Sequence, residues 1–87
     1  MKIQFDETAW EQITYWREQD KKTLRKINKL LEDISLNGNT GLGHPEPLKD
    51  NLSGYWSREI DKKNRLIYKI EGDSITVIQC KNHYDEK

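Results

Sequence analysis

Hydrophobic and polar positions in the first part of the chain predict one short strand followed by two helices. Ile3 and Phe5 alternate with polar neighbours, and a period of two is typical of a strand. Asp6 and Asp20 each precede a segment in which apolar residues recur every three or four positions, and an aspartate can cap the first turn of a helix. The first helix has its apolar face at Ala9, Ile13 and Trp16, and the second at Leu24, Ile27, Leu30, Leu31 and Ile34. The Asn-Gly-Asn sequence at residues 37–39 should end the second helix.

The second half of the chain predicts a long loop and then three strands. Residues 40–54 contain three glycines and both prolines, so we expect a loop there with room for one short extended piece. Segments of strand character follow at residues 55–61, 65–71 and 74–82, separated by short polar turns. Two helices that precede three strands bury their apolar faces most simply against the sheet. The pattern therefore predicts an α+β fold of order β-α-α-β-β-β, an antiparallel sheet with both N-terminal helices packed on one side.

Length and composition restrict the kind of protein. A chain of 87 residues forms one domain, and a domain of this size buries only about 60–65% of its unfolded surface, so the ligand should lie in a surface groove. The net charge of zero argues against tight binding of naked nucleic acid through bulk electrostatics. No apolar run approaches the roughly 18 residues of a membrane span. No signal peptide is visible, and the single Cys80 cannot form an internal disulfide, so we expect a cytoplasmic protein.

Basic residues are concentrated on the second predicted helix. Residues 21–36 contain five bases and two acids. Four of the bases lie away from the apolar face of the helix, at Lys22, Arg25, Lys26 and Lys29. Such a stripe is either simply solvated or contacts the phosphate backbone of a large RNA such as ribosomal RNA. The second interpretation predicts a steep salt dependence of binding.

Ionisable residues in the second half could together cleave RNA through its own 2′-hydroxyl. That reaction needs a base for the hydroxyl, an acid for the leaving 5′-oxygen and positive charge near the phosphorus. Glu46 stands between two prolines that hold the backbone extended, so its carboxylate is a candidate base. His83 is a candidate acid, and Arg65 can grip two phosphate oxygens. The further candidates for holding the RNA are Lys49, Arg58 and Tyr84.

Each of these residues, taken alone, also has an ordinary structural explanation. Glu46 could be a solvated loop residue, because glutamate is almost always exposed. Arg65 could form a surface ion pair with Glu59 or Asp61. Tyr84 could either stack on an unpaired RNA base or cover the edge of the sheet. The joint occurrence of the set is what favours catalysis.

No metal or other cofactor is expected. A zinc site needs about four ligands, whereas Cys80, His44 and His83 show no paired spacing. Cys80 lies among strand residues, where a buried apolar role is commoner than a nucleophilic one.

A shared site for Arg65 and His83 constrains how the last two strands pair. A strict two-residue turn at residues 72–73 would pair Arg65 with Cys80, and His83 would then face the other side of the sheet. The hypothesis of a shared site therefore predicts one of two irregularities. Either a three-residue loop pairs Arg65 with Gln79, or a β-bulge precedes His83.

Six short blocks, in order along the chain, form a specific pattern. They read TyrTrpArg at 15–17, LysIleAsnLysLeu at 26–30, HisProGluProLeuLys at 44–49, AsnLeuSerGlyTyrTrpSerArg at 51–58, AsnArgLeuIleTyr at 64–68 and AsnHisTyr at 82–84. On these blocks the chain resembles the YoeB (Txe) branch of the RelE toxin superfamily. The resemblance covers essentially the whole length and implies a single RelE-like toxin domain at residues 1–87.

The resemblance also implies a function. It implies the toxin of a type II toxin–antitoxin pair, an endoribonuclease that enters the ribosomal A site and cuts messenger RNA during translation. It further implies neutralisation by a YefM-like antitoxin and frequent homodimerisation. By the same resemblance, Glu46 would be the general base, His83 the general acid, and Arg65 the group that stabilises the transition state. The residues that would position the substrate are Lys49, Arg58 and Tyr84.

Two other interpretations stay open at this point. The chain could be a non-catalytic relative that binds an antitoxin or ribosomal RNA, or a ribonuclease that works without the ribosome. The candidate catalytic residues are Glu46, Arg65, His83 and Tyr84, and the complete set favours catalysis over binding alone. Zero net charge and the lack of a deep groove favour a need for the ribosome to orient the message. The chain also departs from the family pattern at Glu59, where a second basic residue is usual.

Overall fold

The helices and the strands of the second half form close to where the sequence predicts them. The structure, a computed structural model, describes residues 1–83. Its elements are β1 (Lys2–Phe5), α1 (Glu7–Gln19), α2 (Lys21–Asn37), β2 (Glu46–Pro47), the 3-10 helix η1 (Asp50–Leu52), β3 (Trp56–Glu59), β4 (Arg65–Glu71) and β5 (Ser74–Gln79). The long loop contains the expected short extended piece, β2, and also η1. The strands β3 and β5 end two and three residues earlier than predicted.

Both helices begin at the predicted caps. The Asp6 carboxylate accepts a hydrogen bond from Ala9 N at 2.8 Å, and the Asp20 carboxylate accepts one from Thr23 N at 3.1 Å. These bonds satisfy backbone N–H groups that have no partner within the helix. The second helix ends at Asn37, and Gly38 follows with a φ of 68°, a left-handed conformation that glycine adopts without steric cost.

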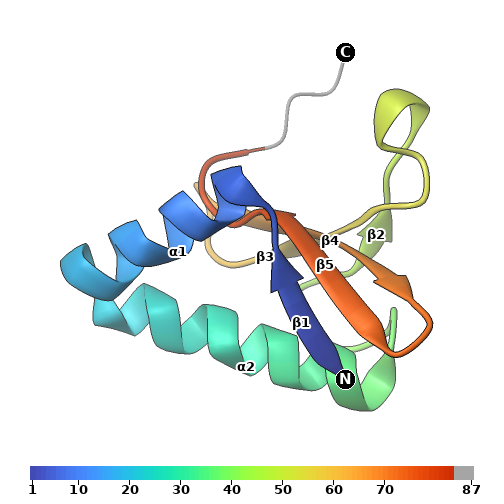
Figure 1. Cartoon of the computed structure of the whole chain (residues 1–87), viewed down its shortest axis with the longest axis horizontal. Coiled ribbons are helices and arrows are strands. Elements are labelled where there is room, and N and C mark those ends of the chain that lie inside the picture. The colour runs from blue at the N-terminus through green and yellow to red at the C-terminus, as the bar shows by residue number, and fades with distance from the viewer. Residues whose placement is uncertain (84–87) are drawn as a thin grey trace.

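The five strands form one sheet, and both helices pack on the same face of it (Figure 1). The strand order is β1-β5-β4-β3-β2. Strands β2 to β5 pair antiparallel, as predicted for the meander. Strand β1, however, pairs parallel with β5, so the sheet is mixed and the prediction of a wholly antiparallel sheet is wrong in this respect. A period of two identifies a strand but carries no information about its direction.

The core lies between the two helices and one face of the sheet. Its helical part comprises Ala9, Ile13, Trp16, Ile27, Leu30, Leu31 and Ile34, and its sheet part includes Leu66, Tyr68, Ile75, Val77 and Cys80. Leu24 is only partly buried against this cluster. The apolar faces read from the sequence are thus the buried faces of the helices. No helix within residues 1–83 combines the length and apolarity needed to cross a membrane.

A β-bulge interrupts the pairing of β4 with β5. Glu71 pairs with Ser74 across a tight two-residue turn, and the regular register continues to Tyr68 opposite Val77. The next pair is Ile67 with Gln79, so the register shifts by one residue. Of the two predicted irregularities, the bulge is therefore confirmed and the three-residue loop is not formed.

Candidate functional site

Glu46 and Arg65 meet on the sheet face that is opposite the helices. Glu46 stands in β2, where it pairs with Ser57 of β3, and its side chain is 52% exposed. Arg65 opens β4, and its Nη2 lies 3.4 Å from Glu46 Oε1. An exposed carboxylate beside a guanidinium supplies a proton acceptor and a positive charge at neighbouring points of a surface that RNA can reach.

Ser57 supports this pair, and the sequence analysis did not identify it. Its side chain is fully buried, and its Oγ accepts a hydrogen bond from Arg65 Nε at 2.6 Å. Because Ser57 also pairs with Glu46 in the sheet, it lies between the two charged residues. Alternation in a strand puts Ser57 on the opposite face from Arg58. It indicates Ser57 only once Arg58 is known to face the core, and the sequence did not show that.

His83 lies against the turn between β3 and β4. Its Nε2 is 2.9 Å from the carbonyl oxygen of Lys62, and the side chain is exposed. The preceding residue, Asn82, has a φ of 67° and accepts a hydrogen bond from Arg65 N at 3.1 Å. The structure thus connects the backbone beside His83 directly to Arg65. Tyr84, the fourth predicted catalytic residue, lies outside the described residues.

The two predicted substrate-positioning cations differ. Lys49 is exposed and directly precedes η1, so it is accessible to a ligand. Arg58 has no exposed side-chain surface. The prediction that Arg58 contacts the substrate directly is therefore wrong. Its guanidinium lies on the side of the sheet that faces the helices.

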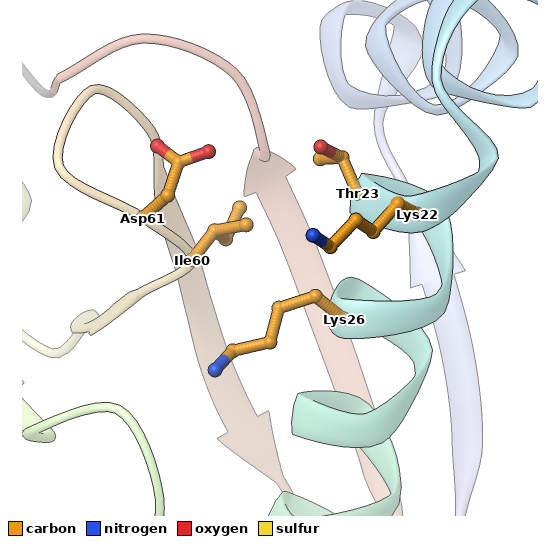
Figure 2. Close-up of a pocket in the computed structure, with 5 residues that line it drawn as sticks. All are labelled: Lys22, Thr23, Lys26, Ile60 and Asp61. Carbon is orange, nitrogen blue, oxygen red and sulfur yellow. The ribbon is translucent and has the colours of Figure 1, made fainter.

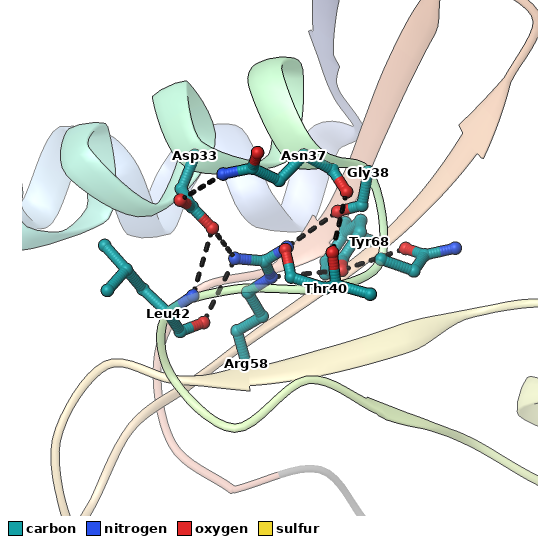
Figure 3. Close-up of polar contacts among 8 residues, drawn as sticks. Asp33, Asn37, Gly38, Thr40, Leu42, Arg58 and Tyr68 are labelled. Carbon is teal, nitrogen blue, oxygen red and sulfur yellow. Dashed lines mark hydrogen bonds and ion pairs between the residues drawn. The ribbon is translucent and has the colours of Figure 1, made fainter.

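Arg58 instead holds the loop that follows α2 (Figure 3). It forms an ion pair with Asp33 and donates to the carbonyl oxygens of Gly38 at 2.6 Å, Leu42 at 3.0 Å and Thr40 at 3.2 Å. Its Nε donates to the Tyr68 hydroxyl at 3.2 Å. A side chain that binds three carbonyls of one loop fixes the shape of that loop. The loop leads to β2, so Arg58 contributes to the placement of Glu46.

Asp33 completes this anchor. Its carboxylate accepts hydrogen bonds from Arg58, Leu42 N and the Asn37 amide. The Arg58 guanidinium and these N–H groups hold the pKa of the Asp33 carboxyl below its usual value. Gly41 passes so close that a Cβ there would meet the Asp33 carboxylate, so the loop needs glycine at this position.

Two of the four basic residues predicted to contact ribosomal RNA line a groove. Lys22 and Lys26, with Thr23, form its α2 side, and Ile60 and Asp61 form the opposite side (Figure 2). The groove has a volume of about 420 Å³, and a second hollow of about 250 Å³ next to it is also lined by Lys26. Arg25 and Lys29 are exposed on the same helix. An exposed basic wall of this kind fits a phosphate backbone.

Cys80 takes the buried role that the sequence predicts. Its side chain is completely buried, and burial raises the pKa of its thiol to about 12. A thiol in that state is a poor nucleophile at neutral pH. Within residues 1–83, the structure brings no three His, Cys, Asp or Glu side chains together in a way that could hold a metal ion.

Comparisons of sequence and of structure with known proteins point to the same family. Residues 5–84 match the YoeB-like toxins of bacterial type II toxin–antitoxin systems. The toxin YoeB of Streptomyces coelicolor is 45% identical over 84 residues, which cover 97% of this chain and all of that protein. A YoeB/ParE toxin structure from Agrobacterium tumefaciens superposes with a TM-score of 0.93 at 37% identity, covering 97% of this chain and 100% of that one.

Two structures from Staphylococcus aureus show assemblies of such toxins. One is a YoeB dimer, with a TM-score of 0.91, and the other is a heterotetrameric YoeB–YefM toxin–antitoxin complex, with a TM-score of 0.92. In both, the toxin is 44% identical to this chain, and the match covers 97% of this chain and 98% of that one.

Proposed function

Because this chain belongs to the YoeB-like toxins of bacterial type II toxin–antitoxin systems, we propose that it is an endoribonuclease that cuts messenger RNA in the ribosomal A site. The observation that carries the proposal is the contact of Glu46 with Arg65, whose guanidinium is also held by the buried Ser57. A carboxylate and an arginine fixed side by side at the surface of a sheet are suited to phosphate chemistry.

The proposed reaction is attack of a ribose 2′-oxygen on the adjacent phosphorus. Glu46 takes the proton from the 2′-hydroxyl, and the 2′-oxygen forms a bond to phosphorus. Arg65 stabilises the extra negative charge of the five-coordinate transition state. His83 gives its proton to the 5′-oxygen as the bond from phosphorus to that oxygen breaks. The products are a 2′,3′-cyclic phosphate and a 5′-hydroxyl, and these steps call for no cofactor.

The remaining predicted residues would hold the substrate. Lys49 is exposed on the loop after Glu46 and can contact a phosphate. Tyr84, next to the proposed acid, would stack on a base or hydrogen-bond to the phosphate. Arg58 acts from within the fold, through the loop that leads to β2.

The ribosome is proposed as the platform on which the message is presented. With zero net charge the domain has little long-range attraction for naked RNA. Lys22 and Lys26 of α2, which line a groove with Asp61 on its other side, offer a local contact for ribosomal RNA. A message that the ribosome already holds needs little further orientation by a small domain.

We also propose the partners of this toxin from its relatives. The Staphylococcus aureus complex of YoeB with YefM supports a YefM-like antitoxin, and the dimer from the same organism supports a homodimer. A toxin that acts on translating ribosomes would work in the cytoplasm.

Primer extension on one message, both naked and in a translating extract, tests the proposal. The parent protein should cut only the translated message. Glu46→Gln and His83→Gln should remain folded and should each cut about 10²–10⁴-fold more slowly, the usual contribution of one acid or base. Gln19→Ala, which removes an exposed amide at the end of α1, is the control and should cut normally.

Each contrary result points to a different function. Equal cutting of the naked message would refute dependence on the ribosome. Near-normal cutting by either Glu46→Gln or His83→Gln would refute that residue's role. No cutting at all by the parent protein would favour a non-catalytic binder of antitoxin or ribosomal RNA.

A further inference from the structure

We propose that Asn64 is a positioning residue for His83: its side-chain amide holds the segment that presents the imidazole. The inference rests on the role proposed above for His83 as general acid. Asn64 is the last residue of the turn between β3 and β4, and Arg65 follows it directly. Its side chain is one of the few buried polar groups of the described chain, with 7% exposure.

The amide of Asn64 has a fixed orientation. Its Nδ2 donates to both oxygens of the Asp61 carboxylate, at 3.0 Å and 3.2 Å. The same carboxylate accepts hydrogen bonds from Lys63 N and Asn64 N, each at 2.8 Å. Because Nδ2 must face the carboxylate, Oδ1 faces away from it. The turn therefore presents a rigid acceptor toward the end of the chain.

Asn64 Oδ1 accepts a hydrogen bond from Asn82 N at 2.7 Å. The carbonyl oxygen of Asn82 accepts from Arg65 N at 3.1 Å. Two consecutive residues, 64 and 65, thus hold both backbone polar groups of Asn82. Asn82 is in the left-handed region, with a φ of 67°. Asparagine adopts this region more readily than most residues, so the two hydrogen bonds select one of the backbone conformations that are open to Asn82.

The direction of the chain at Asn82 determines where His83 points. The imidazole is exposed, and its contact with the carbonyl oxygen of Lys62 at 2.9 Å is to the same turn. Three contacts of the segment therefore come from residues 62–65, which also carry Arg65, and Gln79 Nε2 adds a fourth by donating to the Asn82 carbonyl oxygen at 3.0 Å. Loss of the Asn64 amide would remove the partner of Asn82 N and leave the backbone of Asn82 held through its carbonyl oxygen alone. A shift of about 1 Å in a reacting group can cost about 100-fold in rate.

A double-mutant cycle separates positioning from a merely structural role. Cleavage on programmed ribosomes is measured for the parent, Asn64→Ala, His83→Gln and the double variant, with Gln19→Ala as control. Asn64→Ala should lower kcat about 10–100-fold and change KM less than about twofold. In the His83→Gln background, Asn64→Ala should cost less than about twofold, because the group that it positions is already absent.

Hydrogen exchange of the Asn82 amide, measured by NMR, gives a readout that does not depend on catalysis. Exchange should be at least about tenfold faster in Asn64→Ala than in the parent. If Asn64→Ala is too unstable, Asp61→Asn keeps the side-chain volume and weakens the same anchor, and it should show the same pattern with a smaller loss.

An equal loss from Asn64→Ala in both backgrounds, unchanged Asn82 exchange, or near-normal cutting would overturn the inference. If His83→Gln itself cuts normally, the proposed role of His83 has failed. Asn82 exchange then decides separately whether Asn64 holds the segment.

Discussion

Arg58 is the residue whose removal should damage the fold most. It is fully buried and donates five hydrogen bonds, to the Asp33 carboxylate, the carbonyl oxygens of residues 38, 40 and 42, and the Tyr68 hydroxyl. Arg58→Ala would leave the Asp33 carboxylate, whose side chain is 14% exposed, and several carbonyls without their buried donor. The cost of such a change comes chiefly from the groups that remain unpaired.

The expected loss of stability follows from the burial of Arg58 in its ion pair with Asp33. Removing one partner of a buried ion pair costs about 3–5 kcal/mol, whereas a small domain has about 5–15 kcal/mol in total. For a domain of this size, each 1 kcal/mol lowers Tm by about 4–8 °C, so Arg58→Ala should lower Tm by at least about 12 °C. The Tm of Arg58→Lys should lie between those of the parent and Arg58→Ala, since one ammonium cannot reach every carbonyl that the guanidinium binds.

Urea and thermal denaturation in the Glu46→Gln background would measure these effects without toxicity from the active enzyme. The matched control is Glu71→Gln, which breaks an exposed pair with Lys69 whose side chains are 65% and 30% exposed and leaves the Lys69 ammonium over the Tyr55 ring. That pair should contribute less than about 1 kcal/mol. A free energy of unfolding for Arg58→Ala within about 1 kcal/mol of the value for Glu71→Gln would refute the assignment of Arg58 as the anchor of the loop.

Three further predictions concern other groups. The pKa of the Asp33 carboxyl is lower in the folded than in the unfolded state, so its stabilisation is complete above the unfolded pKa of about 4 and is lost as the pH falls through the folded pKa. Urea titrations at neutral and acidic pH should show this decline, and Asp33→Asn should flatten it. Burial raises the pKa of the Cys80 thiol to about 12. A thiol reagent at pH 8 should therefore label Cys80 at least about 100-fold more slowly in the native than in the urea-unfolded protein. Equal labelling rates would contradict the burial of Cys80. Gly43→Ala should destabilise by about 1–3 kcal/mol, because φ is 78° and a Cβ would lie 3.0 Å from the Glu59 carbonyl oxygen. Gly54→Ala, where nothing lies within 4 Å of the added Cβ, should cost less in the same urea titration.

The elements that the sequence predicted well depend on local signals. Both helix starts follow from one aspartate each, at Asp6 and Asp20, and both buried faces follow from the spacing of apolar residues. Interactions of this kind span three or four residues, so the sequence contains them directly. The direction of β1 cannot be read from local sequence. It depends on a contact with β5, about 70 positions later, as in the pairing of Ile3 with Ile75.

The candidate site divides in the same way. Chemistry and resemblance predict Glu46, Arg65 and His83 as site residues, but they do not predict the groups that hold these residues. Arg58 resembled a ligand for phosphate until the register placed it opposite Leu66, on the core face of the sheet. An arginine in a strand is charged whichever face it is on, so only the pairing of strands decides between a substrate contact and a buried anchor.

The β-bulge in β5 shifts the pairing of β4 with β5 by one residue, and the spacing of the buried residues of β5 reflects it. Ile75 and Val77 are buried and obey a period of two, but the next buried residue on the core face is Cys80, three positions later. A step of three in a period of two means that one extra residue has been inserted, which is the definition of a β-bulge. The extra residue shifts every later side chain to the other face and brings Asn82 into contact with the first residue of β4. The apolar sequence alone does not reveal this step, because Ile78 is apolar too and only the observed burial selects Val77 and Cys80. The bulge was predicted instead from the requirement that Arg65 and His83 share a face of the sheet.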